Sequence, residues 1–241
     1  VAGVPILILV GNHDLPNSGG KATSVDIYQT LNVPNVTVAR GAGLHVIETC
    51  SGPVQVGCIP YPTRQTILNS DELSGSTISE LNEKVQGAVA RTINKYKEAL
   101  DPDVPAVLTA HLTVSSARVG SEEAMMLGTD VQVRESALND PAWDYVALGH
   151  IHKFQDLNEG AHPPIVYSGS LERIDFGEEG DPKGFCWVEL PTEEGQDTEW
   201  KFVEVSARPF VTISADLREE ENPLAVLRTK VGEHDLSDAV V

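Results

Sequence analysis

The amino-acid sequence predicts an α/β domain organised around an open sheet. Several apolar runs of strand length end abruptly in small or polar residues, as "PILILVGNHD" does over residues 5–14. One long segment instead repeats its apolar residues with helical spacing and opens with Thr77 and Glu80 as a capping box. Histidines follow three of the apolar runs, and ligand sites of open α/β sheets form at the carboxyl ends of strands.

The expected elements follow one another in this order. Residues 5–10 form a buried strand, and residues 23–32 form a short helix capped by Thr23 or Ser24. Alternating apolar and polar residues predict further strands over 35–40, 44–50, 54–62, 106–112, 144–154, 164–170, 184–190 and 199–205. The long helix starts after Thr77 and ends before the sequence "DPDVP". Its inward face comprises Leu81, Val85, Ala88, Val89, Ile93 and Tyr96.

The domain organisation is suggested by a restart of the pattern after residue 205. A strand is expected at 211–217 and a helix at 222–234. We therefore expect one domain over residues 1–205 and the beginning of a smaller α/β domain over residues 206–241. The chain opens at Val1, just before a strand expected in the core, and we expect it to be N-terminally truncated.

Composition narrows the class of protein further. The chain has 241 residues, 41% of them hydrophobic, and its apolar runs are too short to cross a bilayer, so we expect no membrane partner. Three cysteines form no even disulfide framework, which suits a reducing cytoplasm. A net charge of −19, from 17 basic and 36 acidic residues, argues against a sequence-independent nucleic-acid binder. The acidic runs at 191–200 and 217–222 are expected to be solvated surface.

Four of the seven histidines share one context. His13, His111, His150 and His152 each lie just past the end of an apolar strand. Loops that leave adjacent strands converge at that edge, so these side chains are candidates for one site. The remaining histidines are expected to be ordinary strand, loop and helix-end residues: His45, His162 and His234.

The sequence "GHIH" places two of these histidines on one side of the chain. In an extended segment, residues i and i+2 point the same way, so His150 and His152 can face one cavity. Ile151 then turns back into the core, and Gly149 lets the backbone come close.

Metal binding explains these residue types together. Asn12, His111, His150 and His152 offer one amide oxygen and three imidazole nitrogens, a set that suits Mn²⁺, Fe²⁺ or Zn²⁺. No cysteine lies near these motifs, so a structural zinc knot is not expected. Each motif taken alone is also compatible with a hydrogen-bonded turn or an edge strand.

His13 can serve another role. Asp14 follows it directly and can orient the imidazole and keep it protonated. A protonated His beside a phosphate can stabilise developing charge or protonate a leaving oxygen.

The three motifs "GNHD", the strand-borne His111 and "GHIH" resemble the later motifs of calcineurin-like metallophosphoesterases, whose fold is an αββα sandwich. Further stretches are similar to the SbcD-type nucleases of DNA double-strand break repair within that superfamily. These stretches are "IPYP" (59–62), "AHLTV" (110–114), "YSGSLERIDFGEEGDPKGF" (167–185) and "RPFVTI" (208–213). The resemblance covers essentially the whole chain.

The resemblance implies a role for each candidate residue. Asn12, His111 and His150 would bind one metal ion and His152 a second, with Mn²⁺ as the expected ion and Fe²⁺, Zn²⁺ or Mg²⁺ as substitutes. His13, oriented by Asp14, would be catalytic. The enzyme would be a hydrolase of DNA phosphodiesters, acting as exonuclease and endonuclease on duplex ends, hairpins and single strands. It would act as a homodimer with an SbcC-type, SMC-like ATPase in DNA repair and recombination in the bacterial cytoplasm. Residues from about Arg208 would begin the capping domain.

The sequence also departs from that pattern. The Asp-x-His and Gly-Asp-x-x-Asp motifs that should precede "GNHD" are absent, so we expect reduced metal occupancy and little activity from this chain alone. Two other hypotheses about the function remain. A metallophosphatase or cyclic-nucleotide phosphodiesterase of the same fold would suit the acidic charge, and a non-catalytic scaffold would suit the absent motifs.

Overall fold

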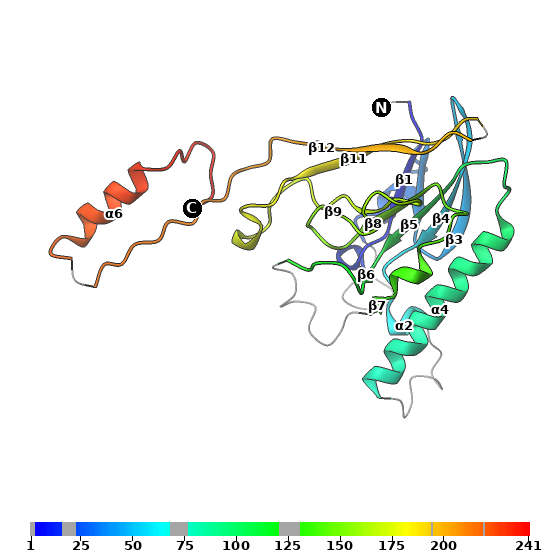
Figure 1. Cartoon of the computed structure of the whole chain (residues 1–241), viewed down its shortest axis with the longest axis horizontal. Coiled ribbons are helices and arrows are strands. Elements are labelled where there is room, and N and C mark those ends of the chain that lie inside the picture. Colours follow the sequence, from blue (N-terminus) through cyan, green and yellow to red (C-terminus); the bar gives the residue numbers. More distant parts are fainter. Residues whose placement is uncertain (1–2, 16–22, 68–76, 121–130, 194, 219) are drawn as a thin grey trace.

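The computed structural model describes residues 3–15, 23–67, 77–120, 131–193, 195–218 and 220–241. Its centre is a six-stranded sheet in the order β3-β4-β5-β8-β10-β9 (Figure 1). The strands β4, β5, β8 and β10 run parallel, and β3 and β9 are antiparallel edges. Their bounds are Gly43–Thr49 (β3), Gly52–Ile59 (β4), Ala106–His111 (β5), Tyr145–Gly149 (β8), Gln155–Asp156 (β9) and Ile165–Tyr167 (β10). The chain is thus a mixed α/β protein, as predicted.

The long helix α4 spans Ile78–Ala99 and packs along the six-stranded sheet. Thr77 and Glu80 form the predicted capping box: Glu80 N–H donates to Thr77 Oγ1 at 3.3 Å, and Glu80 Oε2 accepts from Thr77 N–H at 2.7 Å. Ile93 is fully buried in the core between helix and sheet. The predicted inward face is confirmed, with Val85, Val89, Ile93 and Tyr96 buried and Leu81 and Ala88 partly buried.

A separate two-stranded sheet carries the beginning of the chain. Strand β1 (Ile6–Leu9) pairs in parallel with β2 (Val36–Ala39), and helix α1 (Asp26–Thr30) lies beside it. The predicted strand at 5–10 forms over Ile6–Leu9, but the prediction that it is buried was wrong, since Ile6 is 44% exposed. In the described part of the chain β1 pairs only with β2, so its other edge has no strand to cover it.

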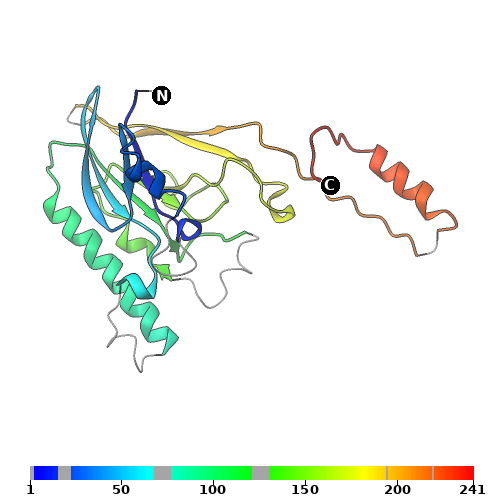
Figure 2. The same ribbon diagram turned by 180° about the vertical axis from the view of Figure 1, so that it is seen from behind.

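The hairpin of β11 (Gly184–Glu189) and β12 (Glu199–Glu204) runs along the domain, as Figure 2 shows from behind. Aromatic rings attach it to the six-stranded sheet. The Phe154 and Phe202 rings stack with centroids 4.1 Å apart, and Trp200 contacts Phe154 and Tyr145. Both strands lie within their predicted ranges.

Short elements fill the connections. They are the turn η1 (Asn12–Asp14), α2 (Arg64–Ile67), β6 (Thr113–Val114), β7 (Gln132–Val133), η2 (Glu135–Ala137) and η3 (Phe176–Glu178).

The C-terminal residues 206–241 extend away from the sheet (Figure 1). Helix α6 (Pro223–Gly232) lies within the predicted helix and is capped by Asn222, whose Oδ1 accepts from Ala225 N–H at 3.2 Å. The predicted strand at 211–217 does not form. Residues 211–217 pair with no strand among the described residues, and the nearest β-bridge joins Phe210, just before this range, to Val240.

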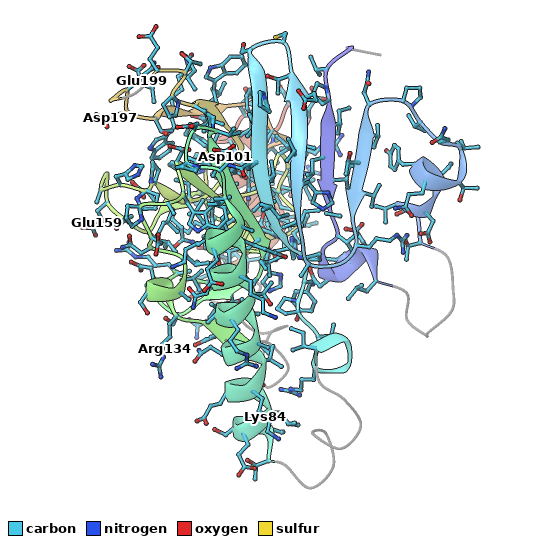
Figure 3. All side chains as sticks on the ribbon, turned by 90° about the vertical axis from the view of Figure 1, so that its right-hand side faces the viewer. Lys84, Asp101, Arg134, Glu159, Asp197 and Glu199 are labelled. Carbon is cyan, nitrogen blue, oxygen red and sulfur yellow. The ribbon has the colours of Figure 1, made fainter. Side chains whose placement is uncertain are left out.

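Charged side chains lie mainly on the outside. Figure 3 labels several of them, including Asp197 in the connection between β11 and β12 and Glu199 at the start of β12. The described acidic residues of the two predicted surface runs are exposed: Glu193, Asp197, Glu199, Glu220 and Glu221. No helix in the described part of the chain has both the length and the apolarity to cross a membrane.

We expect Ile93→Ala to lower the free energy of unfolding by about 2–5 kcal/mol, because it removes buried methyl groups from a packed core. The control is Ile78→Ala at the start of the same helix, where the side chain is 58% exposed and the change should stay within about 0.5 kcal/mol. Urea unfolding of both variants measures the difference. Equal losses would contradict the described packing of α4.

The thiols should differ in reactivity. Burial raises the pKa of Cys58 to about 12, which disfavours its nucleophilic thiolate, while Cys50 is exposed. At mildly alkaline pH we expect a thiol reagent to modify Cys50 in the folded protein and Cys58 only after unfolding. Peptide mapping by mass spectrometry locates the label, and early labelling of Cys58 would show that its strand is not packed as described.

Candidate functional site

The parallel strands bring the predicted residues to one edge of the sheet. His111 is the last residue of β5, and His150 follows the last residue of β8. Tyr61 lies two residues after the end of β4, and Ser170 lies three residues after the end of β10. Because β4, β5, β8 and β10 are parallel, all four carboxyl ends meet here.

Two glycines make room for the His111 ring. The strand register places His111 opposite Gly149, where an added Cβ would lie 3.1 Å from His111 Nδ1. Gly11, before the turn η1, is closer still, since a Cβ there would lie 2.7 Å from His111 Cε1. The imidazole therefore occupies space that any side chain at either position would need.

The Asn12 amide oxygen joins two of the predicted histidines. Asn12 Oδ1 lies 2.9 Å from His111 Nε2 and 3.3 Å from His150 Nδ1. The two imidazole rings are 5.2 Å apart between centroids. One oxygen and two nitrogens, drawn from the turn after β1 and the ends of β5 and β8, thus converge on one point.

His150 has an unusual backbone. Its φ of +99° lies in the region that favours glycine, at a cost of about 1–3 kcal/mol for other residues. This conformation turns the chain sharply after β8. Ile151 is buried in the core, as predicted, at 1% exposure.

The turn η1 is closed by Asp14 rather than by a contact of Asp14 with His13. The Asp14 carboxylate accepts from Gly11 N–H at 2.9 Å, and Asp14 N–H donates to Gly11 O at 3.2 Å. These bonds hold the peptide that presents Asn12. The His13 side chain is exposed to solvent beside this turn.

His152 has a carboxylate partner that sequence reasoning missed. Its Nδ1 lies 2.8 Å from Glu178 Oε1, on the short helix η3. The other oxygen, Glu178 Oε2, accepts from Lys183 Nζ at 2.7 Å. Glu178 and Lys183 are each only 1% exposed, so the carboxylate that contacts His152 belongs to a buried ion pair. The only sequence signal was a Glu and a Lys five residues apart in a stretch that otherwise predicts a loop.

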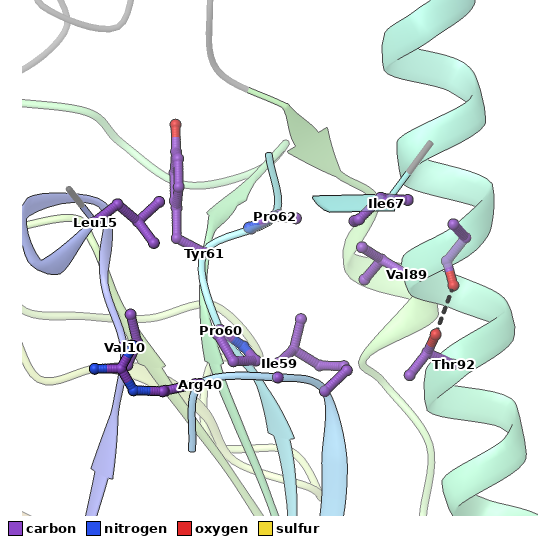
Figure 4. A pocket seen from close by; sticks show the side chains of 13 residues that line it. Val10, Leu15, Arg40, Ile59, Pro60, Tyr61, Pro62, Ile67, Val89 and Thr92 are labelled. Atoms are coloured by element: carbon purple, nitrogen blue, oxygen red, sulfur yellow. Dashed lines mark hydrogen bonds between the residues drawn. The ribbon is translucent and has the colours of Figure 1, made fainter. Parts of the chain in front are cut away.

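An apolar pocket of about 330 Å³ adjoins these residues (Figure 4). Tyr61 links the two, since it lines the pocket and its ring centroid lies 5.3 Å from that of His150. The other walls come from the segment after β1, the loop after β2, the end of β4, and helices α2 and α4. The lining residues include Val10, Leu15, Arg40, Ile59, Pro62, Ile67, Val89 and Thr92.

The donor set fits a divalent metal ion. Imidazole nitrogens and an amide oxygen are suitable ligands for Mn²⁺, Fe²⁺ or Zn²⁺. In the described residues no three His, Cys, Asp or Glu side chains form a metal-binding group. The Asn12 amide oxygen is the further donor atom that lies beside His111 and His150.

Compared with models of known protein families, the chain matches none.

We expect Gly11→Ala to displace the His111 ring, because the new methyl group would overlap it at 2.7 Å. The variant should shift the His111 ring resonances in NMR spectra and lower stability by about 1–3 kcal/mol. Gly41→Ala is the matched control, since a Cβ there meets nothing within 4 Å. Unchanged His111 resonances in Gly11→Ala would show that the ring lies elsewhere.

Proposed function

We propose that this chain is a metal-dependent phosphoesterase with a calcineurin-like sandwich fold, and that it belongs to an SbcD-type nuclease acting on DNA. The observation that carries the proposal is the convergence of Asn12 Oδ1 with His111 Nε2 and His150 Nδ1 at the carboxyl edge of parallel strands. The motifs "GNHD" and "GHIH" supply these side chains in the order of the family that the sequence resembles.

The arrangement of layers supports the sandwich. The six-stranded sheet carries α4, while the separate β1–β2 sheet carries α1 and brings Asn12 to the shared edge. A backbone bond from Tyr61 N–H to Val10 O, 3.1 Å long, joins the ends of β4 and β1 there. A site at which two sheets meet is what the proposed fold requires.

Each side chain has a proposed task. Asn12, His111 and His150 would hold one divalent ion, and His152, backed by Glu178, would bind a second. When bound, such ions polarise a phosphodiester and supply a water-derived nucleophile at neutral pH. His13, exposed beside Asn12, would hold a proton on its imidazole and donate it to the leaving oxygen of the phosphate.

The acidic surface bears on the substrate and partners. With a net charge of −19, this chain would need a basic partner surface to hold DNA, and we propose that an SbcC-type, SMC-like ATPase provides it. A second copy of the nuclease subunit, with which this chain would form a homodimer, carries the same negative charge and adds no basic surface. The same charge favours a second candidate function, hydrolysis of small phosphate monoesters or cyclic nucleotides, which need no long basic groove.

Metal binding tests the proposed ligands. We expect calorimetric titration with Mn²⁺ to give binding that Asn12→Ala weakens at least about 10-fold, because the oxygen between the two imidazoles is lost. His45→Ala on edge strand β3 is the control and should bind like the wild type. Wild-type affinity in Asn12→Ala would contradict the assignment.

Hydrolysis distinguishes the two candidate functions. In Mn²⁺ we expect slow digestion of linear duplex DNA by residues 1–241, because the proposed protein ligands number three for one ion and one for the other. His13→Ala should abolish digestion and leave Mn²⁺ binding unchanged. Turnover of a nucleotide monoester or cyclic nucleotide, with no digestion of DNA, would favour the second candidate.

A further inference from the structure

A buried chain of polar groups leads from His152 into the protein interior. Glu178 bridges His152 Nδ1, 2.8 Å from its Oε1, and Lys183 Nζ, 2.7 Å from its Oε2. The Lys183 ammonium also donates to Ser170 Oγ at 2.9 Å and to the His152 carbonyl oxygen at 3.3 Å. The Ile174 N–H donates to Glu178 Oε2 at 3.3 Å. Both members of the ion pair are almost completely removed from solvent.

The chemistry of these groups fixes the direction of every hydrogen bond. An ammonium can only donate, so Glu178 Oε2 and Ser170 Oγ accept from Lys183. The Ser170 hydroxyl proton is then directed to the Glu172 carbonyl oxygen, 2.9 Å away. A carboxylate can only accept, so the proton between Glu178 Oε1 and His152 belongs to Nδ1.

The geometry points to Glu178 as a positioning residue that holds a ring proton of His152 on Nδ1, with Lys183 fixing the carboxylate. This leaves the lone pair of His152 on Nε2, the nitrogen that a metal ion would use. The role of this tautomer in metal binding rests on the proposed function. The tautomer itself follows from the buried contacts and can be measured without metal.

Glutamine at position 178 should invert the tautomer. The glutamine amide has one acceptor oxygen and one donor NH₂ group. The place that Glu178 Oε2 occupies in the wild type faces two donors, Lys183 Nζ and Ile174 N–H. The oxygen must therefore face Lys183, which turns the NH₂ group toward His152. His152 Nδ1 then has to accept, and the ring proton moves to Nε2.

Removing the lysine should partly reverse this effect. In Glu178→Gln with Lys183→Met, only Ile174 N–H remains of the two donors near Oε2, so the amide oxygen can accept either from Ile174 or from His152 Nδ1–H. We expect part of the Nδ1–H tautomer to return in this double variant, which also leaves no unpaired charge in the interior.

The experiment is long-range ¹H–¹⁵N NMR of the histidine rings in the metal-free protein, at about pH 8, where free imidazole is neutral. We expect Nδ1–H for His152 in the wild type, Nε2–H in Glu178→Gln, and a mixture with a larger Nδ1–H fraction in the double variant. The control is Asp181→Asn, a carboxylate of the same loop that instead bonds Lys153 at 2.7 Å, and it should match the wild type.

Two results would overturn the inference. One is Nε2–H in the wild type, and the other is an unchanged tautomer in folded Glu178→Gln. If Glu178→Gln does not fold, Glu178→Leu with Lys183→Met replaces it, and persistence of a pure Nδ1–H tautomer there would be equally fatal.

Metal titration of the same proteins separates this inference from the proposed function. We expect Glu178→Gln to weaken the Mn²⁺ site that contains His152 by about 10–100-fold and Asp181→Asn to leave it unchanged. Wild-type protein without Mn²⁺ binding would overturn the proposed function, while the tautomers would still decide the role of Glu178.

Discussion

The hydrogen bonds of Asn12 are the constraint on which the rest of the site depends. A single amide oxygen contacts imidazoles from β5 and β8, although Asn12 itself belongs to the turn after β1. The contact is possible because Gly11 and Gly149 leave the space that the His111 ring occupies. The contact therefore requires the turn after β1, the register of β5 on β8 and both glycines together. It also joins the two sheets at the candidate metal site.

Local patterns made much of this structure predictable. Helix α4 could be predicted from the spacing of its apolar residues and from the Thr77–Glu80 capping box. Each of these signals involves residues only a few positions apart in the sequence. His111 and His150 were predicted to meet because both end apolar strands, and parallel pairing of β5 with β8 brings such ends to one edge. Ile151 could be assigned to the core from the alternation in "GHIH" alone.

Features set by distant partners were not predictable in the same way. The exposure of β1 depends on which strands pair with it, and the residues 211–217 alternate correctly but meet no described strand. The partner of His152 lies 26 positions further along the chain, in a segment whose acidic and glycine-rich composition predicts only a loop. The expected contact of Asp14 with His13 gave way to bonds with Gly11, because the backbone of a tight turn competes for the same carboxylate.

The loop that carries Glu178 also contacts the C-terminal residues. Arg173 donates to Glu178 O and to Arg208 O, and Phe176 lies edge-on against Phe210, 5.1 Å away between centroids. This loop thus contacts the imidazole of His152 through Glu178 and the residues that lead to α6 through Arg173 and Phe176. The path of the chain after β12 and the position of Glu178 beside His152 are therefore fixed by the same loop.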